Sequence, residues 1–444
     1  MFHKQLILDN SKSNIGAAKT FRQVKELVHG YENIGPTLVD IKNFQRAIKS
    51  YIGERDVDLF LDRLEKLKAT QPQFYFAYDV DASNCLTKVI WADSTSIRNY
   101  SFFGDAISFD PTYGTNKYDM VFTPFTSVNH HRKSVFFAAC LLSHEDELSF
   151  KWAFQHFLTA MGQKEPQFLI TDQCPGIKKT FPSVFKQARH RYCMWHITQK
   201  ITDKVGSALC KDTDFLHRFN AVVWDSDLEP FEFEKKWQQL ISDFQLEDNE
   251  WLSTIFTDRK HWIPAYHREL PMGCILRTTQ RSGSANSFFK RFQTAMDQQR
   301  NTQRCDDYDS DHSLPNLDTN IHLEKHGAIV YTHVVFKMFQ EEVKAAISCG
   351  VADFDKEENL RIIFVEDAEA NRTFKGKGIR QIPRKYILDR WAMNSNATNR
   401  LDPNGNVIED SNMAHSDNSL VCKLQSSVQQ LEFSKLYLRF TWTS

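Results

Sequence analysis

Several common sequence features are missing from this 444-residue chain. Its nine cysteines are scattered without one C-x-x-C pair, so the usual sign of a zinc ribbon or a dithiol redox site is absent. No run of 18 apolar residues could span a bilayer, and the N-terminal stretch does not resemble a signal peptide. We therefore expect reduced thiols, no membrane association, and a location in the cytosol or nucleus.

An excess of positive charge is also missing. The chain has 55 Lys and Arg against 56 Asp and Glu, a formal net charge of −1. Nucleic-acid-binding proteins usually carry a positive excess, so any contact with DNA must use a local basic patch. What the chain has in abundance is apolar and aromatic residues, 41% hydrophobic with 35 Phe, and this length is enough for two or three domains with real cores.

The first 95 residues are predicted to be helical, with a β-hairpin at their end. Apolar residues recur at helical spacing in residues 44–52 and 57–72, and Pro72 ends the second helix. Residues 73–81 and 86–94 are β-rich runs, Q-F-Y-F-A-Y-D-V-D and L-T-K-V-I-W-A-D-S, joined by a turn-forming D-A-S-N.

Residues 96–300 have the pattern of an α/β domain. Three β-rich runs come first, and D-A-I-S-F-D ends the first of them at Asp110. An amphipathic helix follows, S-F-K-W-A-F-Q-H-F-L-T-A-M, and then a short buried strand that ends at Asp172. A helix interrupted by Pro182 is predicted next. The order β-β-β-α-β-α, with acids after the first and fourth strands, is that of a ribonuclease-H-like core of the DDE-transposase type.

The rest of the chain is less regular. Residues from about 200 to 270 are rich in Trp and Phe and predict a helical insertion within this domain. Residues 301–391 are interpreted as a polar linker, over 301–320, and a helical region with one long helix at 328–348. Residues 392–444 are low in apolar content and predict a disordered tail.

Carboxylates that converge from strand ends suit hard divalent cations such as Mg²⁺, because these take oxygen ligands. Two such ions can activate the attacking oxygen and stabilise the leaving oxygen in phosphodiester transfer. Asp110 and Asp172 fit two of the ligand positions. By themselves they are weak indications, since an aspartate after a strand is more often an Asx turn or a helix cap.

Five segments together resemble the plant far-red-impaired-response family, whose members derive from Mutator-like transposases and serve as nuclear transcription regulators. The resemblance runs in order from about residue 20 to 391 and covers most of the chain. The segments are F-G-D-A-I-S-F-D-P-T-Y-G-T-N-K-Y-D-M-V-F-T-P-F-T-S-V-N-H-H, I-T-D-Q-C-P-G-I-K-K, A-R-H-R-Y-C-M-W-H-I, H-W-I-P-A-Y-H-R-E-L-P-M-G-C-I-L-R-T-T-Q-R-S-G-S-A-N-S-F-F-K-R-F and I-P-R-K-Y-I-L-D-R-W.

The resemblance implies a nuclear regulator of DNA-templated transcription. Its partners would be DNA and related family members, as homo- or heterodimers. Members typically carry a WRKY-like zinc finger near the N-terminus and a SWIM zinc finger before the last segment. This chain begins roughly where the first finger would end, and no C-x-C or C-x-H precedes I-P-R-K-Y-I-L-D-R-W. We therefore expect both zinc modules, and their zinc, to be absent.

The resemblance also implies roles for single residues. Asp110 matches the first catalytic aspartate of the family and Asp172 the second. The third acid usually lies in a segment similar to R-S-E-S-x-N, which here runs from Arg281 to Asn286 and has Gly283 at the glutamate position. Removing one charge at ~4 Å from a cation forfeits on the order of 4 kcal/mol at an effective dielectric constant near 20. The two aspartates would then be vestigial ligands that could still hold Mg²⁺, and we predict that the domain is catalytically inactive.

Two alternatives to an inactive regulator remain. One is a residual metal-dependent nuclease or strand-transfer enzyme that uses Asp110, Asp172 and a substitute ligand such as a water or Glu269, although nothing in the sequence argues for either substitute. The other is a sequence-specific transcription factor in its own right. The salt dependence and the base discrimination of DNA binding would separate this last class.

Cys193 and His196 form a C-x-x-H pair. Such a pair is half of a zinc site, which needs two further ligands, and a buried structural pair is the simpler interpretation. Transposase domains of the family carry a similar pair after the second aspartate. The resemblance therefore implies a structural role beside the active site or a contact with DNA, as it does for Arg281 and Asn286.

Other polar clusters are interpreted as structural. We predict that His190 and the pair His130–His131 are turn residues rather than ligands. The acidic segment that begins at Asp307 superficially resembles a calcium loop, but His312 occupies the position of the required glycine and Asp318 replaces the final glutamate. We interpret it as a solvated linker.

Overall fold

The computed structural model describes most of the chain. The described residues are 2–12, 15–29, 35–113, 118–226, 228–270, 272, 276–279, 292–319, 321–348, 350–357, 360–367, 372–377, 382, 387, 389–393, 400–401 and 407–408. The chain forms two compact units, Met1–Thr70 and Gln71–Ser444. None of the described helices combines the length and the apolarity that crossing a bilayer requires.

The first unit is helical, as the sequence predicts. It contains α1 (Phe2–Lys12), α2 (Ala17–Leu27) and α3 (Leu38–Thr70). The two helices predicted after residue 44 are the two halves of α3, which are joined across a kink at Arg55, where the backbone leaves helical geometry. Ile7, Val24 and Ile41 are buried in this unit.

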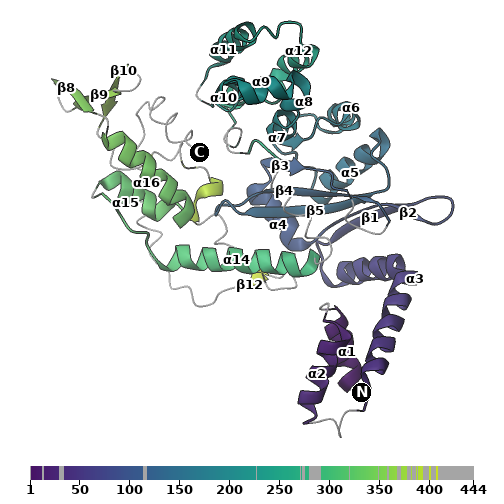
Figure 1. Ribbon diagram of the computed structural model, residues 1–444. Coiled ribbons are helices and arrows are strands. Elements are labelled where there is room, and N and C mark those ends of the chain that lie inside the picture. Colours follow the sequence, from purple (N-terminus) through teal and green to yellow (C-terminus); the bar gives the residue numbers. More distant parts are fainter. Residues whose placement is uncertain are drawn as a thin grey trace. The chain divides into compact units, whose positions relative to one another are not determined.

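A seven-stranded mixed sheet organises the second unit (Figure 1). Its order is β1-β2-β5-β4-β3-β6-β7. The strands are β1 (Tyr75–Val80), β2 (Leu86–Ala92), β3 (Ala106–Phe109), β4 (Val121–Val128), β5 (Ser134–Leu142), β6 (Phe168–Thr171) and β7 (Arg189–Tyr192). Strands β3, β6 and β7 are parallel neighbours, whereas the pairs β3–β4, β4–β5, β5–β2 and β2–β1 are antiparallel.

The predicted hairpin at residues 73–94 is present as β1 and β2. It does not belong with the N-terminal helices, because Lys88 to Trp91 of β2 pair with Ala139 to Leu142 of β5. The hairpin thus extends the large sheet, and the boundary between the two units falls at residue 70 rather than near 95. Apolar residues on β2 explain this position, since Val89, Ile90 and Trp91 are buried.

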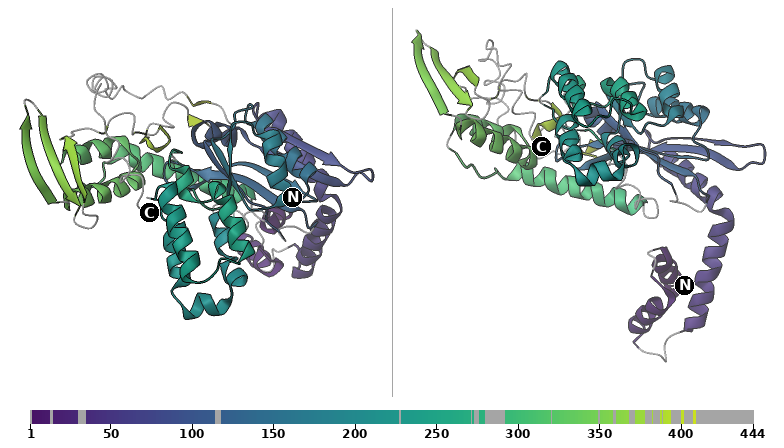
Figure 2. Two further views of the ribbon diagram at one scale, coloured as in Figure 1. Left: turned by 90° about the horizontal axis from the view of Figure 1, so that it is seen from above. Right: turned by 45° about the horizontal axis from the view of Figure 1, so that its top comes forward.

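Helices cover both faces of the sheet (Figure 2). On one face lie α4 (Ser94–Phe103), α5 (Glu147–Ala160) and α6 (Pro175–Val184), packed through a cluster of Phe side chains. On the other face Ala106, Phe168 and Ile170 pack against α15 (His322–Val330), α16 (His333–Ser348) and Trp391. Helix α6 continues through Pro182, which lies only two residues before its end, so the predicted interruption is wrong.

The segment predicted as a helical insertion, residues 200–270, is helical and has a core of its own. It contains α8 (Ile201–Val205), α9 (Ser207–Asp212), α10 (Phe215–Val223), α11 (Pro230–Asp243), α12 (Glu250–Thr257) and the 3₁₀ helices η2 (Asp258–His261) and η3 (Pro264–His267). Helix α7 (Met194–Thr198) leads into it from β7. The fully buried Trp262 donates its indole N–H to the carbonyl of Ile255 at 2.8 Å.

Three predictions for the C-terminal part are wrong. Residues 301–312, expected to be linker, lie in helix α14 (Phe292–His312). The helix predicted over 328–348 is two helices, because Tyr331 is extended and forms a bridge with Ala392. Within 301–391 the chain also forms an antiparallel sheet of β8 (Gly350–Glu357), β9 (Leu360–Asp367) and β10 (Arg372–Lys377).

The remaining elements are short. They are η6 (Asp389–Trp391) and the paired strands β11 (Arg400–Leu401) and β12 (Val407–Ile408). The disordered tail predicted for 392–444 falls almost entirely outside the described residues. In the region before I-P-R-K-Y-I-L-D-R-W, where the family pattern has a SWIM finger, most residues are described and belong to β8, β9 and β10.

Candidate functional site at the ends of three parallel strands

Two aspartates follow neighbouring parallel strands at the same end of the sheet. Strand β3 pairs with β6 in a register that sets Ser108 opposite Ile170, and Asp110 and Asp172 each lie two residues further along. The third parallel strand, β7, delivers Cys193 and helix α7 to this end. Carboxyl ends of parallel strands meet at one edge of a sheet, which is why residues distant in sequence converge here.

Asp110 is buried, with 8% of its surface exposed. Burial raises the pKa of its carboxyl group to about 6, and the nearby negative charge of Asp172 acts in the same direction. His196 and a hydrogen bond from Thr279 oppose that rise. A divalent cation would also oppose it, because a positive charge favours the ionised carboxylate.

Asp172 is only partly buried and is anchored by the start of helix α6. Its Oδ1 accepts a hydrogen bond from the backbone N–H of Cys174 at 3.1 Å. This is the Asx-turn geometry that the simpler interpretation of a strand-end aspartate predicts. The anchoring occupies one lone pair and leaves carboxylate oxygen capacity for a cation.

The side chains of Cys193 and His196 lie in different surroundings. The thiol of Cys193 is fully buried, which raises its pKa, and its Sγ accepts hydrogen bonds from the N–H and hydroxyl of Thr279 at 3.3 and 3.5 Å. His196 instead extends toward Asp110, with its Nε2 3.9 Å from Asp110 Oδ1. Within the described part of the chain, no third His, Cys or carboxylate completes a zinc site around this pair.

The chain that leads to the predicted third position passes beside this site. The N–H of Met194 donates to the carbonyl of Arg277 at 3.1 Å, and buried Arg191 donates to the carbonyl of Leu276 at 3.2 Å. These bonds hold residues 276–279 against β7 and α7. Arg281, Gly283 and Asn286, which follow directly, lie outside the described residues.

Two groups at this end of the sheet were missed from the sequence. The hydroxyl of Tyr113 donates to Glu145 Oε2 at 2.6 Å. Burial raises the Tyr113 pKa, and the negative charges of Glu145 and Asp172 raise it further. Glu145 therefore lies in the electrostatic neighbourhood of Asp172. The only signal that could have found it is its position in the short segment between the end of β5 at Leu142 and the start of α5 at Glu147.

Glu269, the substitute ligand for which nothing in the sequence argued, is engaged elsewhere. It forms an ion pair with Arg189, at the beginning of β7. Because β7 runs parallel to β6, its beginning lies at the end of the sheet opposite to Asp172. His190, predicted to lie in a turn, is within β7, and its Nε2 lies 2.8 Å from the hydroxyl of Thr171.

The parallel strands with acids at their ends are the part of the chain that places it in a class, that of proteins with a transposase-type domain. Residues 106–200, which run from β3 through α7, match the MULE transposase domain family. The chain is 32% identical to FAR1-RELATED SEQUENCE 9 of Arabidopsis thaliana, over 76% of this chain and 69% of that protein. It is also 31% identical to FAR1-RELATED SEQUENCE 5, over 80% of this chain and 47% of that relative.

The similarity to FAR-RED IMPAIRED RESPONSE 1 of the same plant is 27% identity over 84% of this chain and 51% of that protein. The chain therefore belongs to the family of FAR-RED IMPAIRED RESPONSE 1 and the FAR1-related sequences, and the predicted family is confirmed. It spans about half the length of several of the curated relatives it matches.

Proposed function

We propose that this chain is a catalytically inactive, transposase-derived nuclear protein that takes part in regulating DNA-templated transcription. It would act through contacts of its core with related family members and with DNA. The family membership and the MULE transposase domain support the derivation from a transposase.

The sheet supports a ribonuclease-H-like core. Within it, β5-β4-β3-β6-β7 is an order in which three antiparallel strands are followed by two that run parallel to β3. Counted along the chain, Asp110 follows the first of these five strands and Asp172 the fourth. DDE-type transposases place two of their acids at the ends of these strands, so the two aspartates would be remnants of a metal-binding set.

One observation carries the proposed inactivity. Gly283 stands where the family pattern has glutamate, and among the described residues Asp110 and Asp172 belong to no group of three potential ligands whose atoms lie within 4.8 Å of one another. Two carboxylates that lack the third charge hold divalent cations more weakly, since each unit charge near the ion contributes several kcal/mol.

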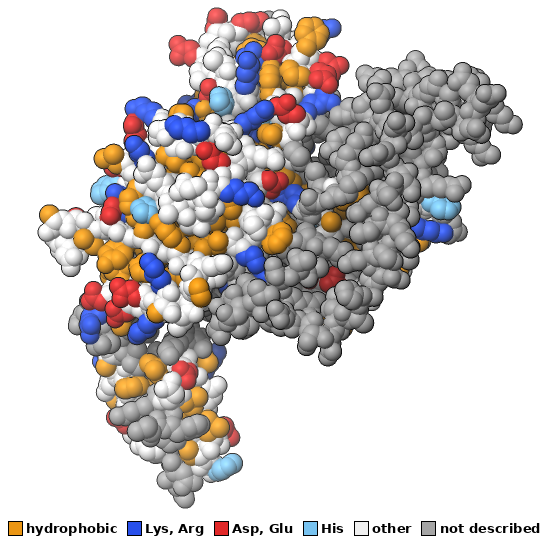
Figure 3. Space-filling model, turned by 180° about the vertical axis from the view of Figure 1, so that it is seen from behind, with side chains coloured by type: hydrophobic (Ala, Val, Ile, Leu, Met, Phe, Trp, Pro, Cys, Tyr) orange, Lys and Arg blue, Asp and Glu red, His pale blue; other side chains and the backbone are white. Residues whose placement is uncertain are grey.

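The distribution of charge supports weak rather than dominant DNA binding. On the face shown in Figure 3, basic and acidic side chains are interspersed among the residues drawn in colour. The net charge of −1 fits this arrangement. DNA contacts would then go mainly to phosphates, which position a protein without reading sequence. We expect a steep salt dependence and little discrimination between sequences.

A strand-cleavage assay tests the inactivity. The chain, a Gly283→Glu variant and a Gly283→Glu/Asp172→Ala double variant are incubated with labelled DNA and Mg²⁺ or Mn²⁺. We expect no cleavage by the unaltered chain, and cleavage that Gly283→Glu restores should disappear in the double variant. Cleavage by the unaltered chain that is lost in Asp172→Ala would overturn the proposal.

The alternative function is a residual nuclease, and Glu145 is the residue that would supply its third carboxylate. The carboxylate of Glu145 and that of Asp172 both raise the pKa of Tyr113, and Glu145 accepts the Tyr113 hydroxyl, so it is our candidate for a replacement of the missing ligand. If the unaltered chain cleaves DNA, Glu145→Gln should abolish cleavage, whereas Glu147→Gln should not, because Glu147 pairs with Lys179 on the exposed side of α5 and α6.

A further inference from the structure

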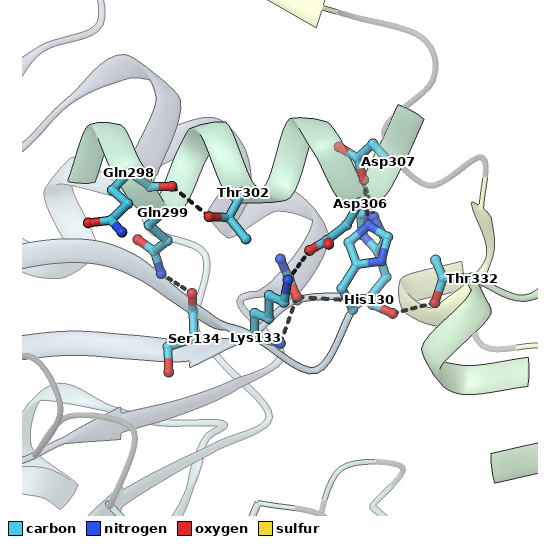
Figure 4. A network of polar contacts seen from close by, with 11 residues as sticks. His130, Lys133, Ser134, Gln298, Gln299, Thr302, Asp306, Asp307 and Thr332 are labelled. Atoms are coloured by element: carbon cyan, nitrogen blue, oxygen red, sulfur yellow. Dashed lines mark hydrogen bonds and ion pairs between the residues drawn. The ribbon is translucent and has the colours of Figure 1, made fainter. Parts of the chain in front are cut away.

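A second cluster of polar side chains lies at the other end of β3. The turn between β4 and β5 carries His130 and His131, and α14 brings Asp307 to it (Figure 4). Asp307 Oδ1 is 2.6 Å from His130 Nε2 and 2.7 Å from His131 Nε2. One atom from each of these three residues lies within 4.8 Å of the other two.

This cluster is separate from the strand-end aspartates. Strand β4 is antiparallel to β3, and the hydroxyl of Ser127, near the end of β4, donates to the carbonyl of Ala106, the first residue of β3. Asp110 follows the last residue of β3. The length of β3 therefore separates the histidine cluster from the strand-end aspartates. A function of the histidine cluster thus does not rest on the function proposed for the aspartates.

Hydrogen bonds within the protein hold the turn that carries the histidines in place, and they do not require a bound ligand. Asn129 Oδ1 accepts hydrogen bonds from the N–H groups of His131 and Lys133 at 3.0 and 2.9 Å. Thr332 donates its hydroxyl to the carbonyl of His130 at 2.7 Å (Figure 4). Both imidazoles are nearly fully buried, so few alternative rotamers are open to them.

Charges around the cluster have both signs. Lys133 pairs with Asp306, the neighbour of Asp307, and Arg98 lies close enough to feel the charge of Asp307. Asp311, one turn further along α14, adds negative charge. The surrounding charges therefore neither exclude a bound cation nor require one. Whether the cluster can bind a metal ion depends on its three converging atoms, two imidazole nitrogens and one carboxylate oxygen.

Hydrogen bonding alone is one explanation of the cluster. Two neutral imidazoles can each donate Nε2–H to one carboxylate oxygen, which would fasten α14 to the turn. The same three atoms are also a typical donor set for zinc, which takes imidazole nitrogen and carboxylate oxygen and leaves a fourth position to water in many sites. Imidazole nitrogen argues against Mg²⁺ and Ca²⁺, which prefer oxygen.

We propose that His130, His131 and Asp307 bind one divalent transition-metal ion of the zinc type, and that this ion fastens α14 to the β4–β5 turn. Bonds of ~2.0–2.1 Å in tetrahedral geometry set ligand atoms about 3.3 Å apart. The nitrogen-to-oxygen distances of 2.6 and 2.7 Å would thus lengthen by about 0.7 and 0.6 Å, respectively. Asp307 can supply that change, since 30% of its side chain is exposed.

The test compares two neighbouring aspartates. Asp307→Asn keeps an oxygen that accepts from both imidazoles but removes the charge that zinc needs, so it separates metal binding from hydrogen bonding. Asp306→Asn is the matched control, because Asp306 pairs with Lys133 and not with a histidine. The full chain and both variants are stripped with a chelator and then titrated with Zn²⁺ alone. Bound metal is counted by mass spectrometry, and thermal unfolding is followed with and without zinc.

We expect the unaltered chain and Asp306→Asn to bind one more zinc ion per chain than Asp307→Asn, and zinc to raise their unfolding temperature. The affinity of this site in Asp307→Asn should fall on the order of 100-fold, since a unit charge beside the ion is lost. Equal zinc content in all three proteins, or a zinc-independent unfolding temperature of the unaltered chain, would overturn the proposal. If Asp307→Asn does not fold, His131→Gln replaces it with the same two outcomes.

Discussion

Helices α5 and α14 both fasten onto the central sheet, but by opposite means. Helix α5 buries Phe150, Phe154 and Phe157 among the aromatic side chains of the strands. Helix α14 buries one apolar side chain, Met296, but the rest of its half-buried face is mostly polar and is bound by hydrogen bonds and ion pairs. Its contacts are Gln299 to the carbonyl of Ser134, Arg300 to Asp93, Asp306 to Lys133, and Asp307 to His130 and His131.

The difference shows what apolar periodicity can and cannot detect. The hydrophobic effect has no direction, so an apolar stripe at helical spacing is evidence for a helix whatever it packs against. A polar face is bound only if each group meets a particular partner with the right geometry. The polar face of α14 therefore carries no signal until the partners on the turn and sheet are known.

The largest expected effect is on α5. Phe157 is fully buried, and its ring stacks on Phe125 with centroids 4.0 Å apart. Phe157→Ala should lower the free energy of unfolding by about 3–5 kcal/mol, because the core loses apolar burial and gains a cavity. Urea unfolding measures this, with the exposed Gln155→Ala as a control that should change little. Equal effects in the two variants would show that α5 is not held by its apolar face.

A smaller loss is expected on α14. Asp307→Ala, measured with chelator present, leaves two buried imidazoles without their acceptor and should cost about 2–3 kcal/mol. Asp306→Ala breaks only a partly exposed ion pair with Lys133 and should cost about 1 kcal/mol or less. Were the two variants equally stable, the polar contacts of α14 would be interchangeable, and the contrast with α5 would lose its basis.

The smallest expected effect is a dependence on pH. Burial lowers the pKa of His130, and the neighbouring His131 acts in the same direction, although Asp307 and Asp311 oppose it. The unfolded chain then binds more protons than the folded chain below the ordinary histidine pKa of ~6.5. The contribution of neutral His130 to the free energy of unfolding is therefore fully present above that pH. It is lost as the pH decreases through that value, by at most about 1.4 kcal/mol per pH unit.

His130→Gln should flatten this dependence between pH 7.5 and 5.5, because glutamine takes up no proton in that range. Urea midpoints in chelated buffer at a series of pH values provide the measurement, and substitution of the exposed His144 serves as the control. A slope unchanged by His130→Gln would assign the dependence to other groups.

The strand-end aspartates could be located from the sequence because strands and their ends have local signatures. The runs that end at Asp110 and Asp172 are short and apolar, and both are strands in which every residue is buried. The resemblance to the far-red-impaired-response family, now confirmed, gave these positions their chemical meaning. Glu145 lacked both kinds of signal, since it lies in a turn and belongs to none of the matched segments.

The surroundings of the histidine pair depend on a contact that no local pattern encodes. His130 and His131 do lie in a turn, as predicted, but the partner that defines their surroundings is 177 residues from His130 along the chain. The composition of D-D-Y-D-S-D-H, which contains that partner, is that of a solvated loop and predicts a linker rather than a helix. Likewise, the break between α15 and α16 at Tyr331 depends on a bridge to Ala392, which no local pattern predicts.

The sequence alone determined the family, the order of strands and helices around Asp110 and Asp172, and the glycine at position 283. These features depend on apolar periodicity and on matched segments, both of which are written locally in the chain. Only the tertiary structure decided that the hairpin extends the sheet, that Cys193 turns inward while His196 faces Asp110, and that Asp307 meets two buried histidines. Each of these depends on a directional contact between residues distant in sequence, and such contacts exist only once the chain has folded.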